Sequence, residues 1–284
     1  MNAVLIEDEQ YPKLLREIKD APKELYYKGN WDGEIFENCL AVVGSRQMTT
    51  YGKQVTKKIA GEAAAAGLTI VSGFMYGVDA ESHEAALNVG GRTIAVMPCG
   101  IDLIHPEYQQ GLYSEILNNK GLVVSEYEGK MQPAIWTYPR RNRIVVGFSK
   151  AVLVVEAGEK SGSLITANLA KKFKRKLFVV PGPITNQNSK GITQLIREGA
   201  TVVGSAEDIL KYYQVKPAIK NEGGETSISK GIEQKIISQL RKEPLDIDTM
   251  SRNLGVAITE LGTALSLMQL KGLIQLESNK YYVN

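Results

Sequence analysis

The sequence predicts an α/β protein: an extended Rossmann-like, doubly wound parallel sheet over residues 38–214, followed by a small winged-helix domain over residues 230–284. Three observations favour this class. The chain has 284 residues, about two domains at roughly 150 residues each. Short apolar runs alternate with helix-like segments up to residue 214. Beyond a polar stretch, the remaining residues show helical spacing and then a hairpin.

The apolar runs of the first domain are predicted to be buried strands, at residues 40–43, 68–71, 93–97, 122–124, 151–155, 177–180 and 201–203. Several lack polar alternation, as expected for strands that are covered on both faces. Helix-like segments lie between them, including residues 53–66, 80–87, 163–173 and 192–197. A repeated strand–helix order produces a parallel sheet with right-handed crossovers.

Three further segments flank this domain. Residues 1–37 form an N-terminal arm with two prolines and several aromatic residues, which we expect to pack on the main domain. Residues 215–229 are polar and contain Gly-Gly and Ser, which predicts a flexible linker. Residues 232–240, 249–254 and 258–271 have helical character, and residues 273–276 and 281–283 form a hairpin. Three helices and a hairpin are typical of a winged helix.

Composition excludes several classes of protein. The chain has 34 Lys and Arg against 31 Asp and Glu, a net charge of +3, so bulk charge alone does not predict a nucleic-acid partner. Cys39 and Cys99 are far apart and form no CxxC pair, so neither a disulfide framework nor a zinc site is expected. The N-terminus resembles no signal peptide, and no apolar run approaches the roughly 18 residues of a membrane span. We therefore expect a cytoplasmic protein without a membrane partner.

Glycines follow most of the predicted strands. In a doubly wound sheet the ligand lies outside the carboxyl ends of the strands, and glycine lets backbone N–H groups approach an anion closely. For a single loop, a tight turn is an equally good explanation. For the whole set we expect a phosphate-binding rim, formed by Gly44, Ser45, Arg46, Ser72, Gly73, Gly77, Ser161, Gly162 and Ser163.

Familiar catalytic and nucleotide signatures are missing from the sequence. The first strand is followed by VVGSRQMTTYG rather than GxGxxG, and neither GxxxxGK[ST] nor HExxH occurs. We therefore predict no cofactor and no metal, and expect His83 and His105 to serve packing.

Positive charge accompanies the glycines. Arg46 follows the first glycine, and Arg140, Arg141 and Arg143 precede an apolar segment. Guanidinium groups bind phosphate through two parallel hydrogen bonds. A third cluster includes Lys171, although it equally fits a solvated helix end that complements the helix dipole. A row of backbone phosphates explains several anion pockets better than one small nucleotide does.

These motifs resemble the DprA/Smf family of DNA-processing proteins. The resemblance rests on Val43-Gly-Ser-Arg46, Ser72-Gly-x-x-x-Gly-Val-Asp79, Gly100-x-Asp102-x-x-x-Pro106, Tyr138-Pro-x-Arg-Asn-Arg-Ile144 and Ser161-Gly-Ser-Leu-Ile-Thr166. It implies a non-catalytic protein that binds and protects incoming single-stranded DNA and loads the RecA recombinase in natural transformation and recombination. It also implies a homodimer formed through the Rossmann domain, and DNA contacts from Arg46, Arg140, Arg141, Arg143, Ser161, Gly162, Thr166 and Lys171.

Two alternatives stay open. A lonely-guy-type phosphoribohydrolase needs PGGxGTxxE, whereas residues 159–168 carry no acid four residues beyond Ser163. A nucleotide-sensing regulator would use the winged helix on an operator, but the charge of that domain is balanced, whereas duplex-binding domains are usually basic. Before residue 11 we find no SAM-like or helix-hairpin-helix segment, which members of the family often carry.

Overall fold

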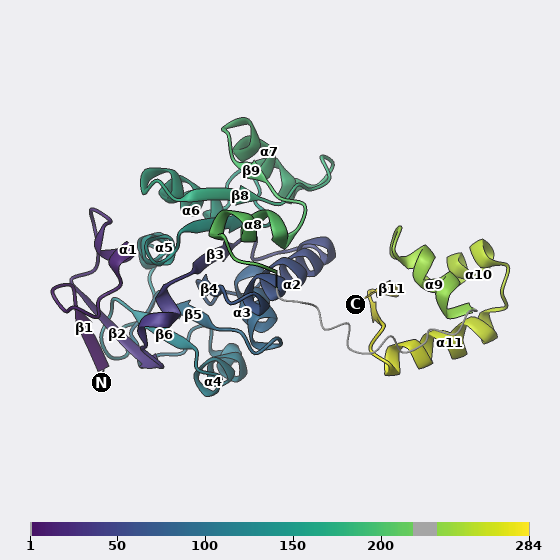
Figure 1. The fold of residues 1–284 in the computed structure, drawn as a ribbon, viewed down its shortest axis with the longest axis horizontal. Coiled ribbons are helices and arrows are strands. Elements are labelled where there is room, and N and C mark those ends of the chain that lie inside the picture. Colours follow the sequence, from purple (N-terminus) through teal and green to yellow (C-terminus); the bar gives the residue numbers. More distant parts are fainter. Residues whose placement is uncertain (1, 218–231, 284) are drawn as a thin grey trace. The chain divides into compact units, whose positions relative to one another are not determined.

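The computed structural model describes residues 2–217 and 232–283. It divides into two units, residues 1–218 and 219–284, which are treated separately below (Figure 1). The predicted linker at residues 215–229 lies, beyond residue 217, outside the described residues.

The first unit is built on one nine-stranded sheet in the order β1-β2-β6-β5-β4-β3-β7-β8-β9. Its parallel part grows in one direction from β3 to β6 and then in the other direction from β7 to β9. The order therefore reverses between β3 and β7, where an open α/β sheet forms its ligand crevice. The parallel strands are β3 (Cys39–Val43), β4 (Thr69–Ser72), β5 (Thr93–Val96), β6 (Leu122–Ser125), β7 (Ala151–Val154), β8 (Lys176–Val179) and β9 (Thr201–Val202).

The N-terminal arm extends the sheet, which the sequence did not predict. Strand β1 (Asn2–Leu5) pairs antiparallel with β2 (Glu24–Gly29), and β2 pairs antiparallel with β6. Strand β1 forms the sheet edge and β2 lies next to it, and both are only partly buried; they mix polar and apolar residues and lack the apolar runs of the central strands. Between them lies the short helix α1 (Lys13–Arg16), whose Leu15 is fully buried.

Helices cover both faces of the sheet. Alternating side chains of β3 separate the two cores: Leu40 and Val42 face one, and Ala41 and Val43 face the other. On the first face lie α2 (Thr50–Ala65), α3 (Val78–Leu87), α4 (Gln110–Asn118) and α8 (Ala206–Tyr213). On the second face lie α1, α5 (Thr137–Phe148), α6 (Gly162–Lys172) and α7 (Lys190–Arg197) (Figure 1). The doubly wound α/β fold is confirmed.

The second unit is the predicted winged helix. Helices α9 (Ile232–Leu240), α10 (Ile247–Leu254) and α11 (Ile258–Leu270) are followed by the antiparallel hairpin of β10 (Ile274–Glu277) and β11 (Lys280–Val283). Their apolar faces share a core of its own, around Ile236, Met250, Leu261 and Leu265. Within the described ranges of both units, no helix is long and apolar enough to cross a membrane.

Candidate functional site

A cavity of about 530 Å³ opens at the carboxyl edge of the sheet, where the strand order reverses. The loops after β3, β4 and β7 and the first turns of α5 and α6 form its walls. The structure thus brings together most of the predicted phosphate-binding residues, namely Gly44, Ser45, Arg46, Gly73, Arg141, Ser161, Gly162, Ser163 and Thr166.

Like Lys160, Arg46 is an exposed cation of this cavity. Its guanidinium carbon lies 5.0 Å from the ring centroid of Tyr138 and 5.7 Å from that of Tyr76. Within the described residues, no carboxylate lies within ion-pair distance of Arg46 and no hydrogen bond occupies its N–H groups. Two aromatic faces therefore position this cation by cation–π attraction while its donors remain available to an anion.

The loop that carries Arg46 is fixed by the β4–α3 loop. Gly77 has φ of +80°, and a methyl group there would overlap the carbonyl oxygens of Ser45 and Arg46. The backbone N–H of Val78 donates to the Ser45 carbonyl at 3.2 Å. Only glycine allows both the left-handed conformation and this close approach. Gly77 therefore fixes the loop of Arg46 through backbone contacts but does not line the cavity.

The N-terminus of α6 points into the same space. Ser161 caps this helix, since its Oγ accepts from the Ser163 backbone N–H at 3.2 Å, and its Oγ lies 3.2 Å from Ser163 Oγ. Free backbone N–H groups and the helix dipole favour an anion at such an end.

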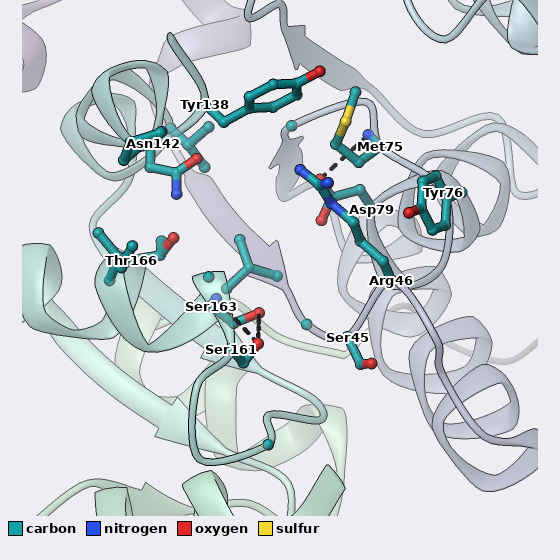
Figure 2. Close-up of a pocket in the computed structure, with 18 of the residues that line it drawn as sticks. Ser45, Arg46, Met75, Tyr76, Asp79, Tyr138, Asn142, Ser161, Ser163 and Thr166 are labelled. Carbon is teal, nitrogen blue, oxygen red and sulfur yellow. Dashed lines mark hydrogen bonds between the residues drawn. The ribbon is translucent and has the colours of Figure 1, made fainter. Parts of the chain in front are cut away.

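The opposite wall carries two hydrogen-bond donors. Asn142 Oδ1 accepts from Arg141 Nε at 3.2 Å, which orients the amide so that Nδ2 faces the cavity. Thr166 is only 2% exposed, and its hydroxyl has no partner among the described residues. Figure 2 shows Arg46 on one side of the cavity and Asn142 and Thr166 on the other, with Ser161 and Ser163 between them.

Arg141 supports the cavity floor instead of offering its charge to a ligand. The side chain is 4% exposed and its Nη1 donates to the carbonyl oxygens of Gly73 and Val96. Burial lowers the pKa of Arg141 to about 10, although nearby Asp79 opposes this effect. Burial in turn raises the pKa of Asp79, which Arg141 partly offsets. A side chain at Gly73 would overlap the Arg141 guanidinium, which explains the glycine there.

Four other predicted residues lie outside this cavity. The Ser72 hydroxyl is buried and donates to the Val42 carbonyl at 2.7 Å. Lys171, near the C-terminal end of α6, pairs with Glu198. Arg140 and Arg143 both pair with Glu126, and buried Arg143 also donates to the Asp20 carbonyl. The three arginines of α5 therefore point to different surroundings, because successive residues of a helix are about 100° apart.

Arg140 and Arg143 line a second cavity of about 640 Å³, between α5 and the N-terminal arm. Pro139 borders both cavities. The second contains Asp20, Glu24 and Glu126 beside Lys23 and the two arginines, so its charge is balanced and it shows no preference for anions.

Sequence reasoning missed several residues of the first cavity, chiefly Tyr76, Tyr138, Asn142, Lys160 and Asn188. Tyr138 and Asn142 lie within the quoted arginine motif, and Lys160 directly precedes the predicted Ser161, so proximity to these motifs was the available signal. His105 was expected to serve packing, yet its Nε2 lies 2.8 Å from the Tyr138 hydroxyl. For His83 the expectation is confirmed, since the ring is fully buried against Thr93.

Fold and cavity together define a Rossmann-like α/β protein with a crevice suited to anionic ligands, combined with a winged helix. The family model of DNA recombination-mediator protein A matches residues 2–214, and that of the DprA winged helix domain matches residues 225–278. The chain therefore belongs to the DprA/Smf family of DNA-processing proteins.

Named relatives support this membership. Protein Smf of Escherichia coli is 35% identical over 275 residues, covering 94% of this chain and 73% of that protein. DNA processing protein DprA of Streptococcus pneumoniae is 42% identical over 207 residues, 73% of this chain and 72% of that protein. Its X-ray structure superimposes with a TM-score of 0.70 over 74% of this chain and 73% of that chain, at 41% identity. A structure that describes the single-stranded DNA binding mode of Helicobacter pylori DNA processing protein A gives a TM-score of 0.67 at 34% identity, over 75% and 96% of the two chains.

Proposed function

We propose that this protein binds single-stranded DNA through the cavity at the carboxyl edge of its Rossmann-like domain. One observation carries the proposal: Arg46 lies against the rings of Tyr76 and Tyr138, and among the described residues no carboxylate is within ion-pair distance of it, although Asp79 is near enough to feel its charge. Arg140, Arg143 and Lys171, in contrast, are already paired with carboxylates. An exposed guanidinium that lines the same cavity as a helix N-terminus is suited to bind a phosphate.

Surrounding groups support a nucleotide chain rather than a lone anion. Tyrosine rings at the cavity offer stacking surfaces to bases, and Asn142 and Thr166 offer hydrogen-bond donors. The single-strand binding described for the Helicobacter pylori relative agrees with this proposal. A flexible strand fits a recessed cavity, whereas a duplex requires a protruding element that enters a groove.

The third helix of the winged helix lacks the basic residues of a helix that reads a DNA groove. This helix, α11, spans Ile258–Leu270 and includes neither Lys nor Arg. A helix that reads the major groove normally carries basic residues toward the phosphates. We therefore propose that this domain contacts a partner protein or a DNA end.

Further parts of the function extend the same proposal. Membership in the recombination-mediator family supports protection of incoming single strands and delivery of RecA during transformation and recombination, without catalysis.

We also propose a homodimer. Near the sheet edge, Ile196, Val202 and Tyr212 are exposed while Ile192 and Leu195 are buried in the core, so apolar surface remains available there. Light scattering tests this dimer directly.

The central test is fluorescence anisotropy of labelled oligo-dT and of a hairpin duplex, measured at several salt concentrations. We expect tighter binding of oligo-dT, with a log–log salt slope of about −0.7 for each phosphate contacted. Equal affinity for the two ligands at the same salt concentration contradicts the proposal. RecA filament formation on strands coated with single-strand-binding protein, with and without this protein, tests the loading role separately.

A further inference from the structure

Two apolar side chains are exposed just before helix α5. Ile135 is 92% exposed and Trp136 is 53% exposed. Trp136 is the N-cap residue of α5, whose first turn supplies Tyr138 and Pro139 to the main cavity. Burying a large aromatic side chain such as tryptophan is more favourable than burying most other side chains. An exposed tryptophan at this position therefore suggests a binding partner.

Trp136 is held in place rather than loosely exposed. Its ring meets Tyr127 edge to face, with centroids 6.0 Å apart and an interplanar angle of 88°. This geometry is favourable for aromatic pairs and fixes the indole plane. A fixed aromatic plane loses little conformational entropy when a flat ligand stacks on it.

A cation lies on the same side of the helix. Arg140 is four residues after Trp136, which places it on the same helical face. Its backbone N–H donates to the Trp136 carbonyl at 3.4 Å. The Arg140 side chain is 53% exposed and is anchored at 3.1 Å to Glu126. Nε and Nη2 of Arg140 pair with Glu126, whereas Nη1 has no hydrogen-bond partner among the described residues and stays open to a phosphate. Proteins that bind single strands place bases on such rings and phosphates beside such cations.

We propose that Trp136, Ile135 and Arg140 form a stacking ledge that receives a nucleobase of the DNA strand where it leaves the cavity. The inference rests on the proposed single-strand binding. The cavity, at about 530 Å³, has the size of a small-ligand site, whereas single-strand sites span several nucleotides. The strand must therefore continue outside the cavity, and Pro139, which lines its wall, also borders the second cavity that Arg140 of the ledge lines.

The two tryptophans of the chain allow a direct test. Trp31 packs against Tyr27 and Phe36 at centroid distances of 4.6 and 4.9 Å, away from the ledge residues. In Trp31→Phe, Trp136 is the sole tryptophan, and we expect oligo-dT to quench its fluorescence. An abasic oligonucleotide of equal length supplies the phosphates without bases and is expected to leave the fluorescence unchanged.

Affinity provides the second readout. Trp136→Leu is expected to weaken binding of oligo-dT about five- to a hundredfold, the loss of one stacked base, and to leave binding of the abasic strand unchanged. Trp31→Phe serves as the matched control and should bind oligo-dT like the unchanged protein. Urea unfolding of each variant verifies that the domain is folded.

The outcomes separate this inference from the proposed function. The ledge is overturned if oligo-dT binds Trp136→Leu with normal affinity and also fails to quench the Trp136 fluorescence of Trp31→Phe. Single-strand binding then still stands. If Trp136→Leu retains its DNA affinity but loses binding to RecA, the surface is a protein contact and the ledge is again overturned. If the unchanged protein does not bind oligo-dT, the proposed function and the ledge fail together.

Discussion

The Arg46 guanidinium carbon lies 5.0 Å from the centroid of the Tyr138 ring, and the Tyr138 hydroxyl lies 2.8 Å from His105 Nε2. The hydrogen bond with His105 thus fixes the aromatic ring that positions the cation. Orienting a cation by aromatic faces differs from orienting it by a carboxylate, because a carboxylate would occupy the N–H donors that a phosphate needs. This arrangement makes Arg46 the most informative residue to change.

Arg46→Ala is expected to weaken oligo-dT binding tenfold or more, because a charge-assisted hydrogen bond contributes about 1.5–3 kcal/mol. Lys57→Ala removes the same charge from the exposed side of α2, outside the cavity lining, and serves as the control. Anisotropy titrations at fixed salt measure both. Equal losses in the two variants mean that Arg46 acts only through net charge and that the cavity assignment is wrong.

His105 is expected to act through Tyr138. Tyr138→Phe and His105→Leu each remove the 2.8 Å hydrogen bond and should each weaken oligo-dT binding about two- to tenfold, matching a net contribution of about 0.5–1.5 kcal/mol. The double variant should bind like the weaker single variant, because both changes remove one interaction. His105→Gln, which retains a polar partner, should recover part of the affinity. Additive losses in the double variant rule out this coupling.

The sequence predicted the central parallel strands and the winged helix well, because their apolar runs and helical spacing reflect deep burial. It failed for β1 and β2, where residues such as Tyr26 and Tyr27 are only partly buried. Strands β1 and β2 are instead defined by their neighbours, through the pairing of β1 with β2 and of β2 with β6. No local pattern expresses those contacts.

The site was predicted in outline but not in its division of roles. Motif spacing located Arg46, Ser161 and Thr166, which do line one cavity. The same reasoning treated Arg141 as a phosphate ligand, whereas its guanidinium is buried on the carbonyls of Gly73 and Val96. The residue at which α5 begins, Thr137, decides which helix face each arginine occupies. Composition alone does not specify where the helix begins.

Arg141→Ala is expected to destabilise the first unit by about 3 kcal/mol or more, because it leaves two buried carbonyls without a charged donor. Arg140→Ala, one residue earlier on α5, removes an exposed pair with Glu126 and should cost less than about 1 kcal/mol. Urea unfolding followed by circular dichroism compares the two. A variant at residue 141 that is as stable as the unchanged protein contradicts the structural role.

His83 is expected to make the protein acid-sensitive. Burial, with a smaller contribution from the charge of Arg141, lowers the pKa of His83 to about 3. The unfolded chain binds this proton near pH 6.5, whereas the folded chain does not until about pH 3. Stability from this group is therefore complete above pH 6.5 and is lost as the pH falls from 6.5 toward 3, by about 1.4 kcal/mol per pH unit. Urea unfolding at pH 7, 6 and 5 should show a shallower pH dependence for His83→Gln than for the unchanged protein. Parallel pH profiles would assign the acid sensitivity to other groups.

The first unit is expected to bind single-stranded DNA without the winged helix. Each unit has a hydrophobic core of its own, and the boundary between residues 218 and 219 falls within the predicted linker. A protein that ends at Val215 keeps the contacts of α8, including the Tyr213 hydroxyl that donates to the Cys39 carbonyl at 2.6 Å. Since every residue that lines the cavity precedes residue 189, oligo-dT affinity should change less than about twofold, while functions that need a partner protein should weaken. Limited proteolysis of the full chain should cut first within residues 215–229, because their sequence predicts a polar linker and such segments are the preferred cleavage sites. A truncated protein that is folded by circular dichroism yet loses most of its oligo-dT affinity would move a large part of the DNA site to the winged helix.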